Sequence, residues 1–104
     1  EFDNIVSYAT TLSKTTSIIT CDSKRFTLSI DYSSDALNTN ENHNIRVLND
    51  KVNLKDTVVV NVTSTEDKLM VYPINIIEDE CTICVLNLGS SITSTVNLTV
   101  LILT

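Results

Sequence analysis

Glycine and proline are almost absent from this chain, which has one residue of each and no tryptophan. The usual turn residues are therefore missing. We expect asparagine and serine, with eleven residues each, and aspartate to form the turns instead, because Asn and Asp tolerate a left-handed backbone. No apolar run reaches the roughly 18 residues of a membrane-spanning helix. The longest, Val100–Leu103, predicts a strand, and we expect no insertion of the chain into a membrane.

Positive charge is also scarce, since seven basic residues stand against thirteen acidic ones and the net charge is −6. Nucleic acids and anionic membranes attract clustered Lys and Arg, so this balance argues against both as partners. The only histidine, His43, falls in the polar segment Asn38–Asn44, which we expect to be a solvated loop. We predict no catalytic residue, no cofactor and no metal site, and hence no enzyme.

The residues that the chain does contain favour β-structure. Thr, Val and Ile make up about a third of the sequence, whereas there are only two Ala. Branched side chains are stiff at χ1 and suit a pleated surface, so the composition predicts an all-β domain. A length of 104 residues with 42% hydrophobic residues allows one domain over residues 1–104. No signal peptide is recognisable, and we interpret the chain as a mature fragment or an excised domain.

Two segments, Phe26–Tyr32 and 94–103, alternate apolar and polar residues in the manner of half-buried strands. The residues expected to face inward are Leu28, Ile30, Tyr32, Val96, Leu98, Val100 and Ile102. The residues expected to face outward are Ser29, Asp31, Thr95, Asn97 and Thr99.

One motif carries a family resemblance. The spacing Leu69-x-Val71-x-x-Ile74-x-x-x-Glu78-x-Glu80-x-Thr82-x-Cys84 resembles the strand E to strand F segment of immunoglobulin domains. Cys21, which ends the segment Ser17–Cys21, matches the first core cysteine of that family. The resemblance implies an immunoglobulin-like β-sandwich of two antiparallel sheets, of variable or intermediate type, with a Cys21–Cys84 disulfide.

Within this superfamily, the segment Ile76–Asn87 resembles strand F of the OX-2 membrane glycoproteins, which carries a second cysteine three residues before the core one. The segments Glu41–His43, Asp50–Leu54 and Asn97–Val100 are similar to other parts of that family. The family pairs the additional cysteine with one on strand G, where this chain has Asn97. We therefore expect Cys81 to be a free, accessible thiol that could link two copies. The Asn- and Ile-rich composition is typical of an AT-rich genome and favours a virus-encoded homologue.

The resemblance also implies a function. It predicts an extracellular domain, secreted or at the cell surface, that binds the inhibitory OX-2 receptor on leukocytes and dampens myeloid activation. The expected binding face carries Ser29, Asp31, Ile83, Val85 and Asn87. Ile83 and Val85 are its apolar anchors, unless they lie under a neighbouring strand or domain. The alternatives are a secreted decoy that sequesters a cytokine or chemokine, and a homophilic adhesion module.

Two short motifs have simpler interpretations. Residues i and i+3 of a strand face opposite sides, so Cys81-x-x-Cys84 is not expected to bind a metal or to act in redox chemistry. We expect Cys84 to point inward and Cys81 outward. Asn61-Val62-Thr63 and Asn97-Leu98-Thr99 match the N-glycosylation acceptor, and we predict Asn61 and Asn97 as glycosylation sites.

Overall fold

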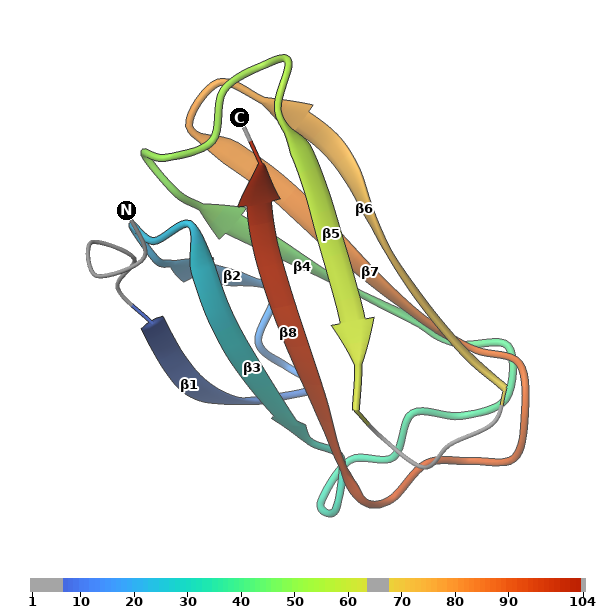
Figure 1. Ribbon diagram of the computed structural model, residues 1–104. Coiled ribbons are helices and arrows are strands. Elements are labelled where there is room, and N and C mark those ends of the chain that lie inside the picture. Colours follow the sequence, from blue (N-terminus) through green and yellow to red (C-terminus); the bar gives the residue numbers. More distant parts are fainter. Residues whose placement is uncertain (1–6, 64–67, 104) are drawn as a thin grey trace.

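A computed structural model describes residues 7–63 and 68–103 as eight strands in two four-stranded sheets. The sheets lie face to face and the strands run roughly along the long axis of the molecule (Figure 1). The prediction of an all-β sandwich is confirmed. Nothing in those two ranges forms a helix long and apolar enough to span a membrane.

Each sheet has its own spatial order of strands. The first sheet contains β1 (Ser7–Ser13), β3 (Arg25–Asp31), β8 (Thr95–Leu103) and β5 (Thr57–Val62), in that order. The second sheet contains β2 (Ile18–Thr20), β4 (Asn42–Leu48), β7 (Glu80–Asn87) and β6 (Leu69–Ile77), in that order.

The chain changes sheet at every step from β1 to β6, and this alternation sets the strand directions. β1 is parallel to β3, and β2 is parallel to β4, because each connection crosses through the opposite sheet. The other pairs are antiparallel, so both sheets are mixed, whereas we expected two antiparallel sheets. The immunoglobulin order would pair the last two strands in one sheet. Here β7 and β8 lie in different sheets, and β8 sits between β3 and β5.

Asparagine and aspartate do take over the role of glycine in the turns. Three non-glycine residues among those described have positive φ: Asn40 and Asp79 lie in turns, and Asn75 lies at the irregularity within β6. Asp79 lies in the two-residue turn between β6 and β7. Its main-chain N–H donates to the Val52 carbonyl at 2.8 Å, and its own carbonyl accepts from Asn49 N at 3.0 Å. The expectation from composition is therefore confirmed in the turn that closes the β6–β7 hairpin.

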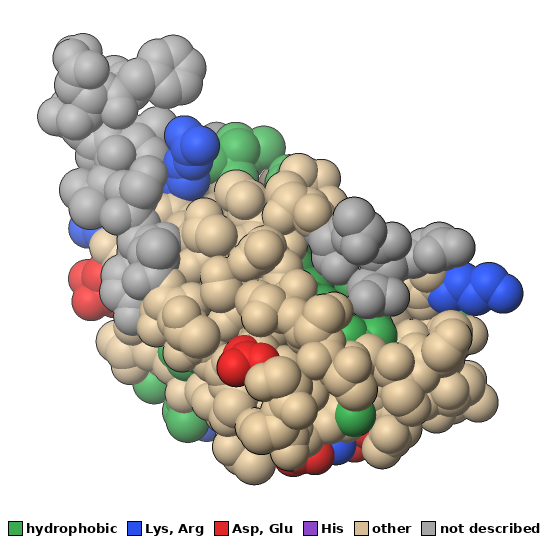
Figure 2. Space-filling view, turned by 90° about the horizontal axis from the view of Figure 1, so that it is seen from below, with side chains coloured by type: hydrophobic (Ala, Val, Ile, Leu, Met, Phe, Trp, Pro, Cys, Tyr) green, Lys and Arg blue, Asp and Glu red, His purple; other side chains and the backbone are tan. Residues whose placement is uncertain are grey.

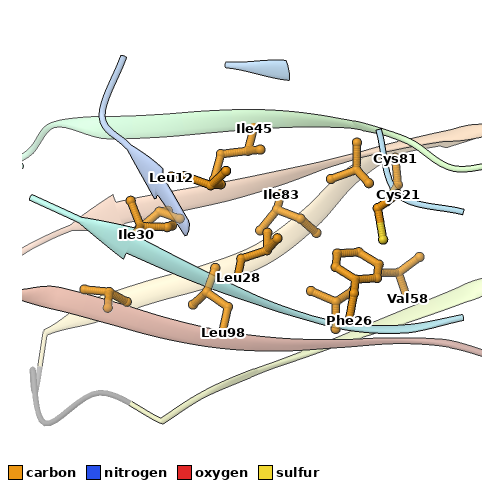
Figure 3. Packing of buried hydrophobic residues seen from close by; sticks show 14 of the residues in the cluster. Leu12, Cys21, Phe26, Leu28, Ile30, Ile45, Val58, Cys81, Ile83 and Leu98 are labelled. Carbon is orange, nitrogen blue, oxygen red and sulfur yellow. The ribbon is translucent and has the colours of Figure 1, made fainter. Parts of the chain in front are cut away.

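The hydrophobic core fills the space between the sheets, with Phe26, Leu28 and Leu98 approaching from one side and Ile45 and Ile83 from the other (Figure 3). The alternation predicted for the two amphipathic strands is confirmed, since the inward residues of β3 and β8 are buried. Their outward residues are exposed or half-buried, which leaves a polar outer surface on the first sheet.

The facing of strand β7 is opposite to the one we predicted. Cys81, Ile83 and Val85 have 0% exposure and belong to the core. Thr82 and Cys84 lie on the outer side of the second sheet, where neighbouring side chains bury them. β7 has apolar residues at both parities, so its alternation could not decide which face is inside. The family resemblance favoured Cys84, whereas the packing favours Ile83 and Val85.

The segment around His43 is also different from the prediction. Asn42–Leu48 forms strand β4 rather than a solvated loop, and His43 is buried at its start. The Tyr32 hydroxyl lies 2.9 Å from His43 Nδ1, and the Thr16 carbonyl oxygen lies 2.7 Å from Nε2. A carbonyl can only accept, so Nε2 carries the proton, and the Tyr32 hydroxyl donates to Nδ1. Partners distant in sequence thus satisfy both ring nitrogens and permit burial.

Candidate protein-binding face

The five residues expected to form a binding face do not lie together. Ser29 and Asp31 are on the outer side of the first sheet. Ile83 and Val85 are inside the sandwich, in the second sheet, and cannot contact a partner. The expected face is therefore wrong, because it assumed that β7 shows these two aliphatic residues to solvent and pairs with β8.

Asn87, the fifth residue, holds a loop in place. Its side chain is buried, and Nδ2 donates to the carbonyls of Leu37 at 3.0 Å and Ser90 at 2.8 Å. Its Oδ1 accepts the Gly89 N–H at 2.9 Å. These three hydrogen bonds fix the start of the β7–β8 connection, so the role of Asn87 is structural.

The structure instead exposes an apolar surface on the outer side of the second sheet. We call it the β6–β7 face, and its six outward residues are Met70, Tyr72, Ile74, Thr82, Cys84 and Leu86. Thr82 and Cys84 are themselves buried, so the exposed apolar area comes from the other four. Met70 is 50% exposed and Tyr72 is 37% exposed. No strand among the described residues covers this side of the sheet.

Cross-strand pairing assembles this face. Met70 is opposite Leu86, Tyr72 is opposite Cys84, and Ile74 is opposite Thr82. Side chains directly opposite each other on one face have Cβ atoms about 4.5–5.5 Å apart, so the three pairs form one contiguous surface. A hydrogen bond between Cys84 and Tyr72 raises the pKa of the Tyr72 phenol.

A polar border adjoins the β6–β7 face on strand β4. The guanidinium of Arg46 donates to the Glu80 carboxylate twice, from Nε at 2.6 Å and from Nη2 at 3.0 Å. This bidentate pairing lowers the pKa of Glu80. Asn42 and Asn44 are exposed on the same side of the sheet. The arrangement, with apolar side chains beside polar ones, is typical of protein interfaces.

The outer side of the first sheet has a different chemistry. It carries both N-glycosylation acceptors, because Asn61 of β5 and Asn97 of β8 are exposed there. Asn61 pairs with Thr99, two residues from Asn97, so the two asparagines are diagonal neighbours on one face. The Ser29 hydroxyl donates to Asn97 Oδ1 at 2.7 Å. The sequence showed two separate motifs but not their convergence.

The end of the sandwich that carries the β3–β4 and β7–β8 connections is mostly polar and uncharged. Figure 2 shows this end as largely backbone and polar side chains, with hydrophobic atoms in small, separate groups. A salt-bridge network orders part of it, since Lys14 Nζ lies 3.1 Å from Asp35 and 3.0 Å from Glu41. The described residues at this end present no continuous apolar surface comparable to the β6–β7 face.

The two cysteines of β7 do not lie on the same face of the strand. Cys81 points into the core and Cys84 away from it, so they face opposite sides of β7 as the i and i+3 spacing predicts. Within the described ranges, no three His, Cys, Asp or Glu side chains form a metal-binding group. The expected exposure of the Cys81 thiol is wrong, because the side chain is wholly buried.

Comparison of the chain with protein-family models, with curated proteins and with solved structures finds no match to any of them.

Proposed function

We propose that this domain is an extracellular protein-binding module that docks its partner on the β6–β7 face. The observation that carries the proposal is the exposure of Met70 and Tyr72, next to Ile74 and Leu86, on a sheet surface that no described strand covers. Contiguous apolar surface with a polar border is typical of protein interaction sites. Tyr is also among the residues that contribute most to binding energy.

The charge of the chain indicates the chemistry of the partner. A net charge of −6 favours a protein that surrounds an apolar contact with Lys and Arg side chains. The OX-2 receptor, as the partner of a virus-encoded ligand mimic, is the candidate that the sequence resemblance names. That part of the proposal rests on the resemblance alone, since the strand order is not that of an immunoglobulin domain.

The acidic charge supports a second candidate, a basic chemokine or cytokine that a secreted decoy would sequester. Both candidates involve binding without a catalytic step. They differ in salt dependence, because association led by charge weakens steeply as ionic strength rises, whereas an apolar contact is much less sensitive.

The test is surface plasmon resonance of the chain against the OX-2 receptor, a panel of basic chemokines and the chain itself. We expect Met70→Asp and Tyr72→Ala to weaken binding by about 2 kcal/mol or more. The matched control is Val59→Asp, since Val59 is 44% exposed on the outer side of the first sheet. Binding that survives both β6 substitutions would contradict the β6–β7 face, and no binding to any of the three would contradict the proposal.

A further inference from the structure

Two of the three cysteines lie in the hydrophobic core. Cys21 follows β2, in the connection that carries the chain from the second sheet to the first, and Cys81 lies at the start of β7. Figure 3 shows both side chains at the same end of the core, near Phe26 and Val58. Cys21 is therefore not placed within a sheet but enters the core from its end, close to Cys81.

Cys84 belongs to another part of the molecule. It lies on the β6–β7 face, where it is buried opposite Tyr72 and hydrogen-bonded to it. A bond between Cys84 and Cys21 would require β7 to turn over, which would bring Thr82 into the core and expel Ile83 and Val85. The immunoglobulin resemblance, which pairs Cys21 with Cys84, therefore assigns Cys21 the wrong partner.

We propose that Cys21 and Cys81 form the disulfide of this domain when it folds in an oxidising compartment, and that Cys84 remains a thiol. The oxidant is a disulfide, either oxidised glutathione or a protein disulfide. One cysteine thiolate attacks the donor disulfide and releases one donor thiolate; the second cysteine thiolate then attacks the mixed disulfide and releases the other. The two cysteines lose two protons and two electrons, and the donor leaves as two thiols.

The burial of both thiols determines when this exchange takes place. Desolvation raises the pKa of Cys21 to about 11 and the pKa of Cys81 to about 11. The reactive thiolate is therefore rare at neutral pH in the folded chain, and the donor cannot reach either sulfur. The bond must form while the core is still open, and the folded, reduced domain resists oxidation.

The test is oxidative refolding of the full chain with reduced and oxidised glutathione, followed by thiol counting in denaturant. All three cysteines are thiols in the reduced chain. We expect a single thiol to remain after refolding of the parent, none in Cys84→Ser, and two in Cys81→Ser and in Cys21→Ser. We also expect dithiothreitol to lower the thermal midpoint of Cys84→Ser but not that of Cys81→Ser.

Each alternative result overturns the proposal. Two remaining thiols in Cys84→Ser together with none in Cys81→Ser would establish the Cys21–Cys84 bond instead. Three thiols in the refolded parent would show that the core stays reduced. Circular dichroism of each variant confirms that it has folded, and the two serine variants of β7 differ only in which side of the strand is changed.

Discussion

The hydrogen bond between Tyr32 and His43 connects the two sheets, and its removal is a sharp test of the structure. Tyr32 follows β3 of the first sheet, and His43 is the second residue of β4 in the second sheet. Tyr32 has no exposed surface, and its hydroxyl lies 2.9 Å from His43 Nδ1. Tyr32→Phe removes one oxygen atom and keeps the aromatic ring, whose centroid is 5.8 Å from that of the imidazole.

The substitution leaves a buried acceptor without a donor, because Nε2 already holds its proton on the Thr16 carbonyl. The cost of an unsatisfied buried polar group is about 1–3 kcal/mol. For a domain of this size each kcal/mol lowers Tm by roughly 4–8 °C. A second substitution, His43→Leu, removes the acceptor that Tyr32→Phe leaves without a donor. We therefore expect the double variant to be about 1 kcal/mol more stable than the sum of the two single effects predicts.

The assay is equilibrium unfolding in urea, followed by circular dichroism, for the parent, both single variants and the double variant. Tyr72→Phe is the control, since it makes the same chemical change on the partly exposed β6–β7 face. The partner of that hydroxyl, Cys84, is only a weak hydrogen-bonding group, so the substitution should alter stability by less than about 0.5 kcal/mol. A loss below about 0.5 kcal/mol for Tyr32→Phe, or strictly additive effects in the double variant, would refute the buried hydrogen bond.

Three further outcomes follow from buried groups. Burial lowers the pKa of His43 below its ordinary 6.5, so the unfolded chain takes up the proton at a higher pH than the folded chain does. The free energy of unfolding should therefore fall as pH falls below about 6.5. Urea unfolding across this pH range should show that this dependence is lost in His43→Gln. Ile83→Ala should cost about 2–5 kcal/mol, whereas Met70→Ala should cost little, in parallel thermal denaturation. Asn49→Ala should cost about 1–3 kcal/mol, because the buried Nδ2 donates to the Ser23 carbonyl at 2.6 Å; a change within error in calorimetry would contradict this.

The alternation of apolar and polar residues predicted the buried face of those strands in which apolar residues occupy only every second position. β3 places all its large apolar residues on one side, and β8 does the same from Val96 to Val100, so their facing could be derived without a partner. In β7, Ile83 and Val85 occupy one parity while Cys84 and Leu86 occupy the other. Which of these two pairs faces the core depends on how it packs against the opposite sheet, and the sequence of β7 alone does not contain that information.

Two other features depend on residues distant in sequence. Asn42–Leu48 begins with three consecutive polar residues, and only the contacts of His43 with Tyr32 and Thr16 explain the burial of the histidine. The candidate binding face was missed because it requires β6 beside β7, an arrangement that the immunoglobulin pattern assigns to different sheets. Composition thus predicted the class of fold, whereas the sheet order, and with it the face, arises from long-range packing.

The central position of β8 governs the course of folding during synthesis. This strand is made last of the eight, yet it joins β3 to β5 and supplies Val96, Leu98 and Val100 to the core. Until it leaves the ribosome, the first sheet has a gap at its centre. Among the described strands, only β6 and β7 are both consecutive in the chain and paired as a hairpin. Such non-local topology folds slowly, on the scale of milliseconds to seconds. During that interval Cys21 and Cys81 remain open to a disulfide donor, and completion of β8 ends their access to it.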